Sequence, residues 1–225
     1  MSALHGLARN GVLRAAINTG NRALVRVEGA QLGGVSPALA ARLAERIGAR
    51  LEPVVYPGAG RVFDDALQDR WDVAFLAIDP LRAARVSFTR PYHVIEATCA
   101  VRADAPIRDV DEIDRPGLRV LTSIGSAYDM YLTANLRDAT LDRFGTPPES
   151  FAAFRDGRAD VVAGVRASLD RFFAEGPEIR ILPGVLTRVE QAMVLPGPDN
   201  PAITALDAFV AEALQDGFVS RALSG

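Results

Sequence analysis

Two stretches of the sequence share one pattern, and this repeat constrains the fold more than any other feature. The first is FDDALQDRWDVAFLAI (63–78) and the second is FAAFRDGRADVVAGV (151–165). Each reads as a helix, a polar turn, an aspartate and an apolar strand. A nearly continuous apolar strand is typical of a parallel sheet whose two faces are both covered. The repeat therefore predicts an α/β protein with two similar, doubly wound lobes.

The first half of the chain alternates between predicted strands and helices. A helix is expected at 35–48, with Ser36 as its N-cap, Pro37 at the first helical position and Gly48 at its end. The other elements expected here are strands at 12–18, 50–57 and 72–78 and a helix at 60–71.

The same alternation starts again further along the chain. The expected strands lie at 94–102, 118–124, 139–146, 159–165 and 190–198, and the expected helices at 125–136, 148–158 and 200–223. Asn200 is a candidate cap of the last helical region, which we expect to be interrupted near Gly217.

We assign residues 1–96 and 191–225 to lobe one and residues 97–190 to lobe two. No flexible linker separates the lobes, so the strands near 94–99 and 189–193 would form two hinges. The ligand cleft is expected between the lobes, at the carboxyl ends of the strands.

Composition excludes several classes of function. The chain has 225 residues, of which 49% are hydrophobic and 24% charged, and its formal net charge is −3. All of the basic residues are arginines, and they are scattered rather than clustered, so nucleic acid is not an expected partner. No stretch approaches the roughly 20 apolar residues of a membrane span. We expect a monomer.

Cysteine and histidine are too few for most catalytic or metal chemistry. The single cysteine, Cys99, lies in an apolar run and is expected in the core. The alternative, a catalytic thiol, would need His5 or His93 as its partner. These residues form no cluster with metal-ligand spacing, so we expect neither a metal nor a cofactor.

The N-terminal segment does not have the pattern of a signal peptide. It lacks a basic region before a continuous apolar run, and residues 11–18 read as a strand. The sequence leaves two expectations open: a cytoplasmic protein if the chain is full-length, or an exported protein whose signal has been removed.

Several segments together resemble one protein family. They are LGGVSPALAARLAERIG (32–48), ALQDRWDVAF (66–75), IDPLRAARVSFTRPY (78–92) and IDRPGLRVLTSIGSAYDMYL (113–132). In this order they resemble the polar amino-acid-binding group of bacterial ABC-importer solute-binding proteins, which have the type II periplasmic-binding-protein fold. The resemblance runs from about residue 11 to residue 223. It implies a periplasmic protein that binds a small solute by closure of two lobes and passes it to an ABC permease.

The resemblance also implies an anchor for the carboxylate of the solute. The family's arginine that pairs with this group falls at Arg82, and a guanidinium fork suits a carboxylate. Backbone amides near Ile78 and Asp79 would add to this anion site. From the other lobe, the resemblance implies the turn Gly125, Ser126 and Ala127, where a helix begins. The alternatives are an arginine that is solvated or in a weak ion pair, for which Asp79 could be the partner, and an ordinary helix cap at Ser126.

Further candidates follow from position. Asn18 and Asn21 follow the first strand, where open sheets bind ligands, although a polar turn explains them equally well. Gln191 and Glu190 lie on the returning hinge strand. The complete set of candidate ligand-binding residues is Arg82, Ala77, Asp79, Gly125, Ser126, Ala127, Asn18, Asn21, Glu96, Arg166 and Gln191.

The sequence departs from the family pattern in several places. The loop after the first strand lacks an aromatic residue, and Ala77 replaces a serine or threonine, so it offers only backbone atoms. The family's ammonium-binding aspartate falls at Val165, and Arg166 follows it. An ammonium group would need Glu96, Asp79 or Glu190 instead, because burying it unpaired is costly. The site would otherwise suit a dicarboxylate or another small organic anion.

Binding without catalysis is therefore the expected function. One alternative is an enzyme on the same fold, as in cyclohexadienyl dehydratases, with Glu96, Asp79 or Glu190 as a general acid. Another alternative is a ligand-sensing module.

Overall fold

The computed structural model describes residues 3–176 and 178–224, and the chain divides into two compact units. Unit one comprises Met1–Thr19, Leu24–Val94 and Glu190–Gly225, and unit two comprises Gly20–Ala23 and Ile95–Val189. The short loop Gly20–Ala23 thus groups with unit two, although the sequence analysis assigned it to lobe one. Strand β6 (Val86–Arg102) and strand β11 (Thr187–Pro196) each have residues in both units.

Unit one is built on a mixed sheet. Its strands, in sheet order, are β4 (Arg50–Tyr56), β1 (Val12–Asn18), β5 (Val73–Ala77), β11 and the part of β6 up to Val94. Strand β1 is parallel to both β4 and β5, and β11 is antiparallel to β5. The remaining elements of the unit are η1 (Ala3–Leu7), the hairpin β2 (Arg26–Glu28) and β3 (Gln31–Gly33), α1 (Val35–Arg46), α2 (Ala59–Asp64), α3 (Pro80–Ala83), α7 (Ile203–Gln215) and α8 (Phe218–Ser224).

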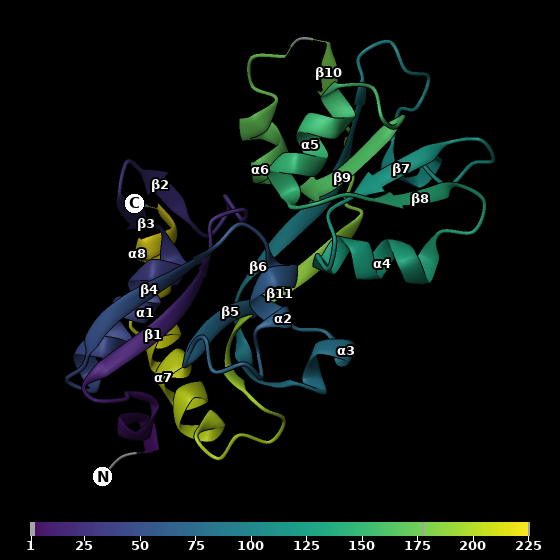
Figure 1. Cartoon of the computed structure of the whole chain (residues 1–225). Coiled ribbons are helices and arrows are strands. Elements are labelled where there is room, and N and C mark those ends of the chain that lie inside the picture. The colour runs from purple at the N-terminus through teal and green to yellow at the C-terminus, as the bar shows by residue number, and fades with distance from the viewer. Residues whose placement is uncertain (1–2, 177, 225) are drawn as a thin grey trace. The chain divides into compact units, whose positions relative to one another are not determined.

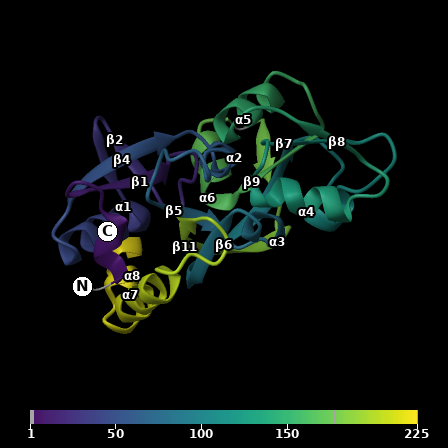
Figure 2. The ribbon, with the colours of Figure 1, turned by 60° about the horizontal axis from the view of Figure 1, so that its bottom comes forward.

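Helices α1, α7 and α8 lie together in unit one (Figures 1 and 2). All five residues of β5 are buried, as the apolar run predicts for a covered central strand. Strand β4 at the end of the sheet is largely exposed, and its Pro53 suits such an edge position. The predicted strand at 12–18 is confirmed.

Helix α1 begins differently from the prediction. Its N-cap is Gly34, and Ser36 lies inside the helix, where its hydroxyl is 3.1 Å from the hydroxyl of Tyr92. Ser36 is therefore not the cap. Gly34 has a φ of 95°, a left-handed conformation that glycine accepts most readily. The expected end of the helix is confirmed, since Gly48 follows the C-cap in the left-handed region.

Two predicted elements have the wrong length. The helix expected at 60–71 ends at Asp64, and turns lead from there to Trp71. The buried Trp71 ring donates its Nε1–H to the carbonyl oxygen of Val62 at 3.1 Å, which holds these turns against the helix. Strand β6 starts at Val86 rather than at 94, so the segment SFTRPY is extended.

The C-terminal helical region is interrupted at Gly217, as predicted, with a φ of 73° between α7 and α8. Asn200 is not the N-cap of α7, because that position is Ala202. The Asn200 side chain instead accepts a hydrogen bond from the Ala202 amide at 3.0 Å and so shapes the turn before the helix.

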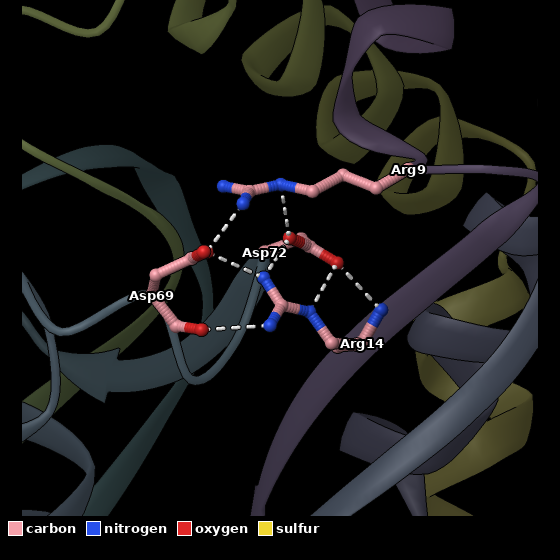
Figure 3. A network of polar contacts seen from close by, with 4 residues as sticks. All are labelled: Arg9, Arg14, Asp69 and Asp72. Atoms are coloured by element: carbon pink, nitrogen blue, oxygen red, sulfur yellow. Dashed lines mark hydrogen bonds and ion pairs between the residues drawn. The ribbon is translucent and has the colours of Figure 1, made fainter.

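An ion-pair network ties the start of β1 to the start of β5 (Figure 3). The buried carboxylate of Asp72 accepts hydrogen bonds from the backbone amide, Nε and Nη2 of Arg14 at 2.7–3.1 Å. Arg9 reaches both Asp72 and the exposed Asp69. Each arginine therefore contacts both carboxylates, and the network lies at the opposite end of β5 from Asp79 and Arg82.

Unit two has the same type of architecture. Its strands, in sheet order, are β6 (from Ile95), β9 (Val161–Val165), β7 (Arg119–Thr122) and β8 (Thr140–Arg143), with β10 (Ile179–Ile181) also paired to β6. Strand β7 is parallel to β8 and β9, whereas β9 and β10 are antiparallel to β6. The helices are η2 (Val110–Glu112), α4 (Ala127–Asn135), α5 (Pro147–Arg155) and α6 (Arg166–Phe172).

Helices α5 and α6 lie on one side of the unit two sheet and α4 lies on the other (Figure 1). Phenylalanine rings from α5 and from the end of α6 form the core beneath the first side, with Phe151 and Phe173 at a centroid distance of 5.9 Å. A Cβ atom on Gly164 of β9 would lie 2.6 Å from the Phe151 ring, so the ring occupies the space beside this glycine.

Among the described residues, no helix has the length and apolar character needed to cross a membrane. Within the same part of the chain, no group of three or more His, Cys, Asp or Glu side chains could hold a metal ion.

Candidate functional site

Arg82 lies on α3, directly after the buried strand β5. The α3 helix is short, and its N-cap is Asp79, followed by Pro80 at the first helical position. The Arg82 side chain folds back so that Nη1 donates to the carbonyl oxygen of Ala77 at 3.1 Å. Only 1% of the residue is exposed. The predicted alternative of a solvated arginine is therefore wrong.

Burial changes the electrostatics of Arg82. Loss of solvation lowers the pKa of its guanidinium to about 10, and the negative charge of Asp79 acts in the opposite direction. The group still carries its proton at neutral pH. A carboxylate bound beside it would offset part of the desolvation of the cation.

The backbone amides beside Arg82 are largely used within unit one. The Ile78 amide donates to the carbonyl oxygen of Glu190 at 2.8 Å. The amides of Leu81 and Arg82 donate to the Asp79 side chain at 2.8 and 3.3 Å. The expectation that the Ile78 amide is open to an anion is therefore wrong, and the Asp79 carboxylate serves the cap.

Other candidates of unit one lie at the same edge of the sheet. Asn18 ends β1, which runs parallel to β5 as its neighbour. Gln191 is opposite Ala77 in the β5–β11 ladder, and only 4% of it is exposed. The carboxyl ends of the parallel strands thus bring Asn18, Ala77 and Arg82 together with Gln191, as the topology of an open α/β sheet requires.

The turn before α4 in unit two is a helix N-terminus with a serine cap. The Ser126 hydroxyl accepts from the Asp129 amide at 3.1 Å. The Asp129 carboxylate accepts from the Gly125 amide at 3.0 Å and from Nε of Arg143 at 2.8 Å. The Ser126 amide donates to the Ser123 carbonyl oxygen at 3.3 Å. This amide is therefore not open to a ligand, and the Ser126 hydroxyl also makes a hydrogen bond with the Tyr128 side chain.

A buried hydroxyl pair supports this turn, and the sequence analysis did not identify it. The hydroxyls of Ser123 and Tyr128 lie 2.6 Å apart, and burial raises the pKa of Tyr128 to about 12. The neighbouring Thr122 hydroxyl is buried and makes no hydrogen bond with the described residues.

Glu96 and Arg166, both candidates, lie together in unit two. Nε of Arg166 is 3.7 Å from the Glu96 carboxylate, and Nη2 of Arg188 is 3.5 Å from it. The Arg166 guanidinium also donates to the carbonyl oxygens of Leu182 and Gly184. Val165, where the family pattern has its aspartate, is opposite Ala97 at the end of β9. The carboxylate of this region is thus Glu96, and two arginines surround it.

Asn21 lies in the loop that groups with unit two. Its side-chain oxygen accepts from the Ala23 amide at 3.3 Å, which supports the polar-turn interpretation. Ser168 of α6 holds the same loop, because its hydroxyl accepts from the Arg22 amide and donates to the Gly20 carbonyl oxygen. Ser168 was not among the predicted site residues, because no helix was predicted at Arg166–Phe172.

Cys99 is a core residue, as expected. It is fully buried opposite Ala163 in the β6–β9 ladder, and burial raises the pKa of its thiol to about 12. At neutral pH the group is a thiol rather than the thiolate that acts as a nucleophile.

Comparison with known proteins finds relatives that are named as an enzyme and as a binding protein. The chain is 29% identical over 171 residues to a cyclohexadienyl dehydratase of Pseudomonas aeruginosa, and the match covers 72% of this chain and 62% of the dehydratase. It is 24% identical over 194 residues to the L-cystine-binding protein TcyJ of Escherichia coli K12, covering 83% of this chain and 71% of TcyJ.

The fold matches solved structures over its whole length. A cysteine-binding protein from Campylobacter jejuni superposes with a TM-score of 0.85 at 21% identity, covering all of this chain and 92% of that one. This similarity confirms the predicted type II periplasmic-binding-protein fold. The pattern of one family matches residues 13–222, and the chain belongs to that family, the bacterial extracellular solute-binding proteins, family 3.

Proposed function

We propose that the protein is the solute-binding component of an ABC-type importer and binds a small carboxylate-bearing solute, an amino acid or a related organic acid. The buried guanidinium of Arg82, at the carboxyl edge of the unit one sheet, carries this proposal. A permanent cation at that edge suits a carboxylate, and Gln191 offers an amide nearby. Family membership and the cystine-binding relative support a binding role.

Each unit would contribute to binding. Unit one would supply Arg82, and unit two the start of α4 at Gly125, Ser126 and Ala127. Strands β6 and β11 run from one unit into the other, so they would serve as hinges when the units close on the solute. The closed form is the form that a permease would recognise, and the proposed place of action is the periplasm.

A thermal-shift screen against amino acids, dicarboxylates and other organic acids tests the proposal, followed by calorimetry on each hit. A solute at 100 times its dissociation constant adds about 2.7 kcal/mol to the free energy of unfolding. Arg82→Gln should weaken binding by about 2 kcal/mol or more, because it removes one partner of a buried charged hydrogen bond.

Two further variants separate binding from folding. Arg82→Lys keeps the charge but loses the planar fork, so it should retain part of the affinity. Arg61→Gln is the matched control, since Arg61 is an exposed arginine on α2 of the same unit. A folded Arg82→Gln protein that binds like the unmodified protein would refute the proposed anchor.

The dehydratase relative favours one alternative, a dehydratase-like enzyme on the same fold. Such an enzyme needs a protonated carboxylic acid, which proteins usually obtain by apolar burial. Glu96 does not have this environment, because its side chain is 39% exposed and two arginines lie within 4 Å. Asp79 is engaged as a helix cap. Turnover of a bound acid, followed by loss of turnover in Glu190→Gln or Glu96→Gln, would establish the alternative.

A further inference from the structure

The two charged groups of an amino acid, its carboxylate and its ammonium group, would each need a partner of opposite charge in the protein. A carboxylate has the buried Arg82 cation as its partner. An ammonium group would need a carboxylate that the protein does not already use. The candidate carboxylates therefore decide which class of solute fits.

In unit one, the Asp79 carboxylate accepts the amides of Leu81 and Arg82 and so completes the start of α3. An ammonium group could recruit it only by breaking this cap. Glu190 is different, because its side chain is exposed and, among the described residues, makes no hydrogen bond or ion pair. Its neighbour Gln191 is buried, so Glu190 points to the other face of the strand.

In unit two, Glu96 lies between Arg166 and Arg188, and this group of three carries a net positive charge. The Asp129 carboxylate is held by the Gly125 amide and by Arg143. The end of β9 is Val165, an apolar residue. An ammonium group brought to this unit would thus meet arginines and carboxylates that are already paired.

The side chains next to these polar groups are apolar and exposed. Ile78 and Leu81, on either side of Asp79 in the sequence, are 37% and 72% exposed. Ile124, which precedes Gly125, is 57% exposed. The Arg166 guanidinium already donates to two carbonyl oxygens, which leaves it poorly placed to hold a second carboxylate.

We infer that the solute is a monocarboxylate with an apolar body and without an ammonium group. This inference rests on the proposed function and narrows its solute class. Arg82 holds the carboxylate, and the exposed Ile78 and Leu81 side chains of the same unit cover the apolar body. An amino acid with the same body is rejected because its ammonium group would lose water without gaining a carboxylate, since Glu190 lies on the other face of β11 from Gln191.

The test uses matched pairs that differ only in the ammonium group. Calorimetry compares 4-methylpentanoate with leucine and 3-phenylpropanoate with phenylalanine, and succinate serves as a dicarboxylate. We expect at least one deamino acid to bind about tenfold or more tightly than its amino acid and than succinate. We expect Arg82→Gln to remove that binding and Arg61→Gln to leave it unchanged.

Each other outcome has a defined meaning. If an amino acid binds as tightly as its deamino partner, the inference is wrong, and loss of that binding in Glu190→Gln would identify Glu190 as the ammonium partner. If an amino acid or succinate binds most tightly and Arg82→Gln weakens that binding, the inference is wrong but the proposed function is retained. If no carboxylate of the panel binds, both the inference and the proposed function fall.

Discussion

Asp72 and Asp79 show how one residue type serves two purposes at the two ends of β5. Asp72 precedes the strand, is buried and accepts three hydrogen bonds from Arg14. Asp79 follows the strand and caps the helix that carries Arg82. The first carboxylate anchors the strand in the sheet, and the second orients the helix that carries the proposed anchor of the solute.

Asp72→Asn should destabilise unit one by about 2 kcal/mol, because it leaves the partly buried donors of Arg14 without a charged acceptor. Urea unfolding followed by circular dichroism measures this loss. The matched control is Asp69→Asn, since Asp69 contacts the same arginines from an exposed position and asparagine tolerates its positive φ. Equal losses in the two variants would show that burial of Asp72 contributes nothing.

At the residue scale, the sequence predicted several candidate ligand-binding residues, but not their burial or the residues that they contact. The DPL segment contains the signals of a helix start, an aspartate followed by proline, and the structure has that helix. The burial of Arg82 was not predictable, because a four-residue helix gives no amphipathic pattern that shows which side faces the protein. The pairing of Glu96 with Arg166 and Arg188 joins residues far apart in the sequence, which local patterns do not reveal.

At the element scale, the start of α1 depends on Gly34. A Cβ atom there would overlap the carbonyl oxygen of Leu24 and lie 3.0 Å from its carbonyl carbon. The sequence analysis chose Ser36 as the cap from residue preference alone. Backbone conformation overrode that preference, because the chain enters the helix with a positive φ and the Ser36 hydroxyl is used against Tyr92.

Gly34→Ala should therefore destabilise the protein by about 3 kcal/mol or more, which combines the positive φ with the steric overlap. Differential scanning calorimetry should show a midpoint lower by about 6 °C or more. Gly29→Ala provides the comparison, because Gly29 also has a positive φ, 61°, but has open space around its Cβ position. A Gly34→Ala midpoint no lower than that of Gly29→Ala would contradict the steric argument.

Helix α7 is joined to β6 by an ion pair that depends on pH. The Asp207 carboxylate accepts from the backbone amide, Nε and Nη2 of Arg90. This pairing lowers the pKa of Asp207 in the folded protein below its ordinary value. The stabilisation is therefore complete above the ordinary aspartate pKa of about 4, and it is lost as the pH falls through the lower folded value.

Measurements of the free energy of unfolding between pH 6 and pH 3 test the contribution of the Arg90–Asp207 ion pair. Asp207→Asn should lose stability at pH 6 and show a shallower decline toward pH 3 than the unmodified protein. Asp199→Asn, at an exposed aspartate of the same unit, controls for the change in net charge. Parallel curves for Asp207→Asn and the unmodified protein would exclude a contribution from this pair.

At the scale of the whole molecule, the repeated helix–aspartate–strand pattern predicted the architecture. Strands β5 and β9 are the apolar runs of the two repeats, and both lie within their sheets. The hairpin β2–β3 and helix α6 were missed, because short elements without a clear period give little sequence signal. Residues Gly20–Ala23 group with unit two through contacts to Ser168, which chain order alone does not predict.

The central claim is that Arg82 binds the carboxylate of the solute. The most direct measurement is a crystal structure of the protein with the panel acid that stabilises it most. We predict that both carboxylate oxygens of that acid lie within hydrogen-bond distance of the Arg82 guanidinium. An acid bound with its carboxylate on other residues, and with Arg82 still directed only at protein atoms such as the Ala77 carbonyl oxygen, would contradict the account.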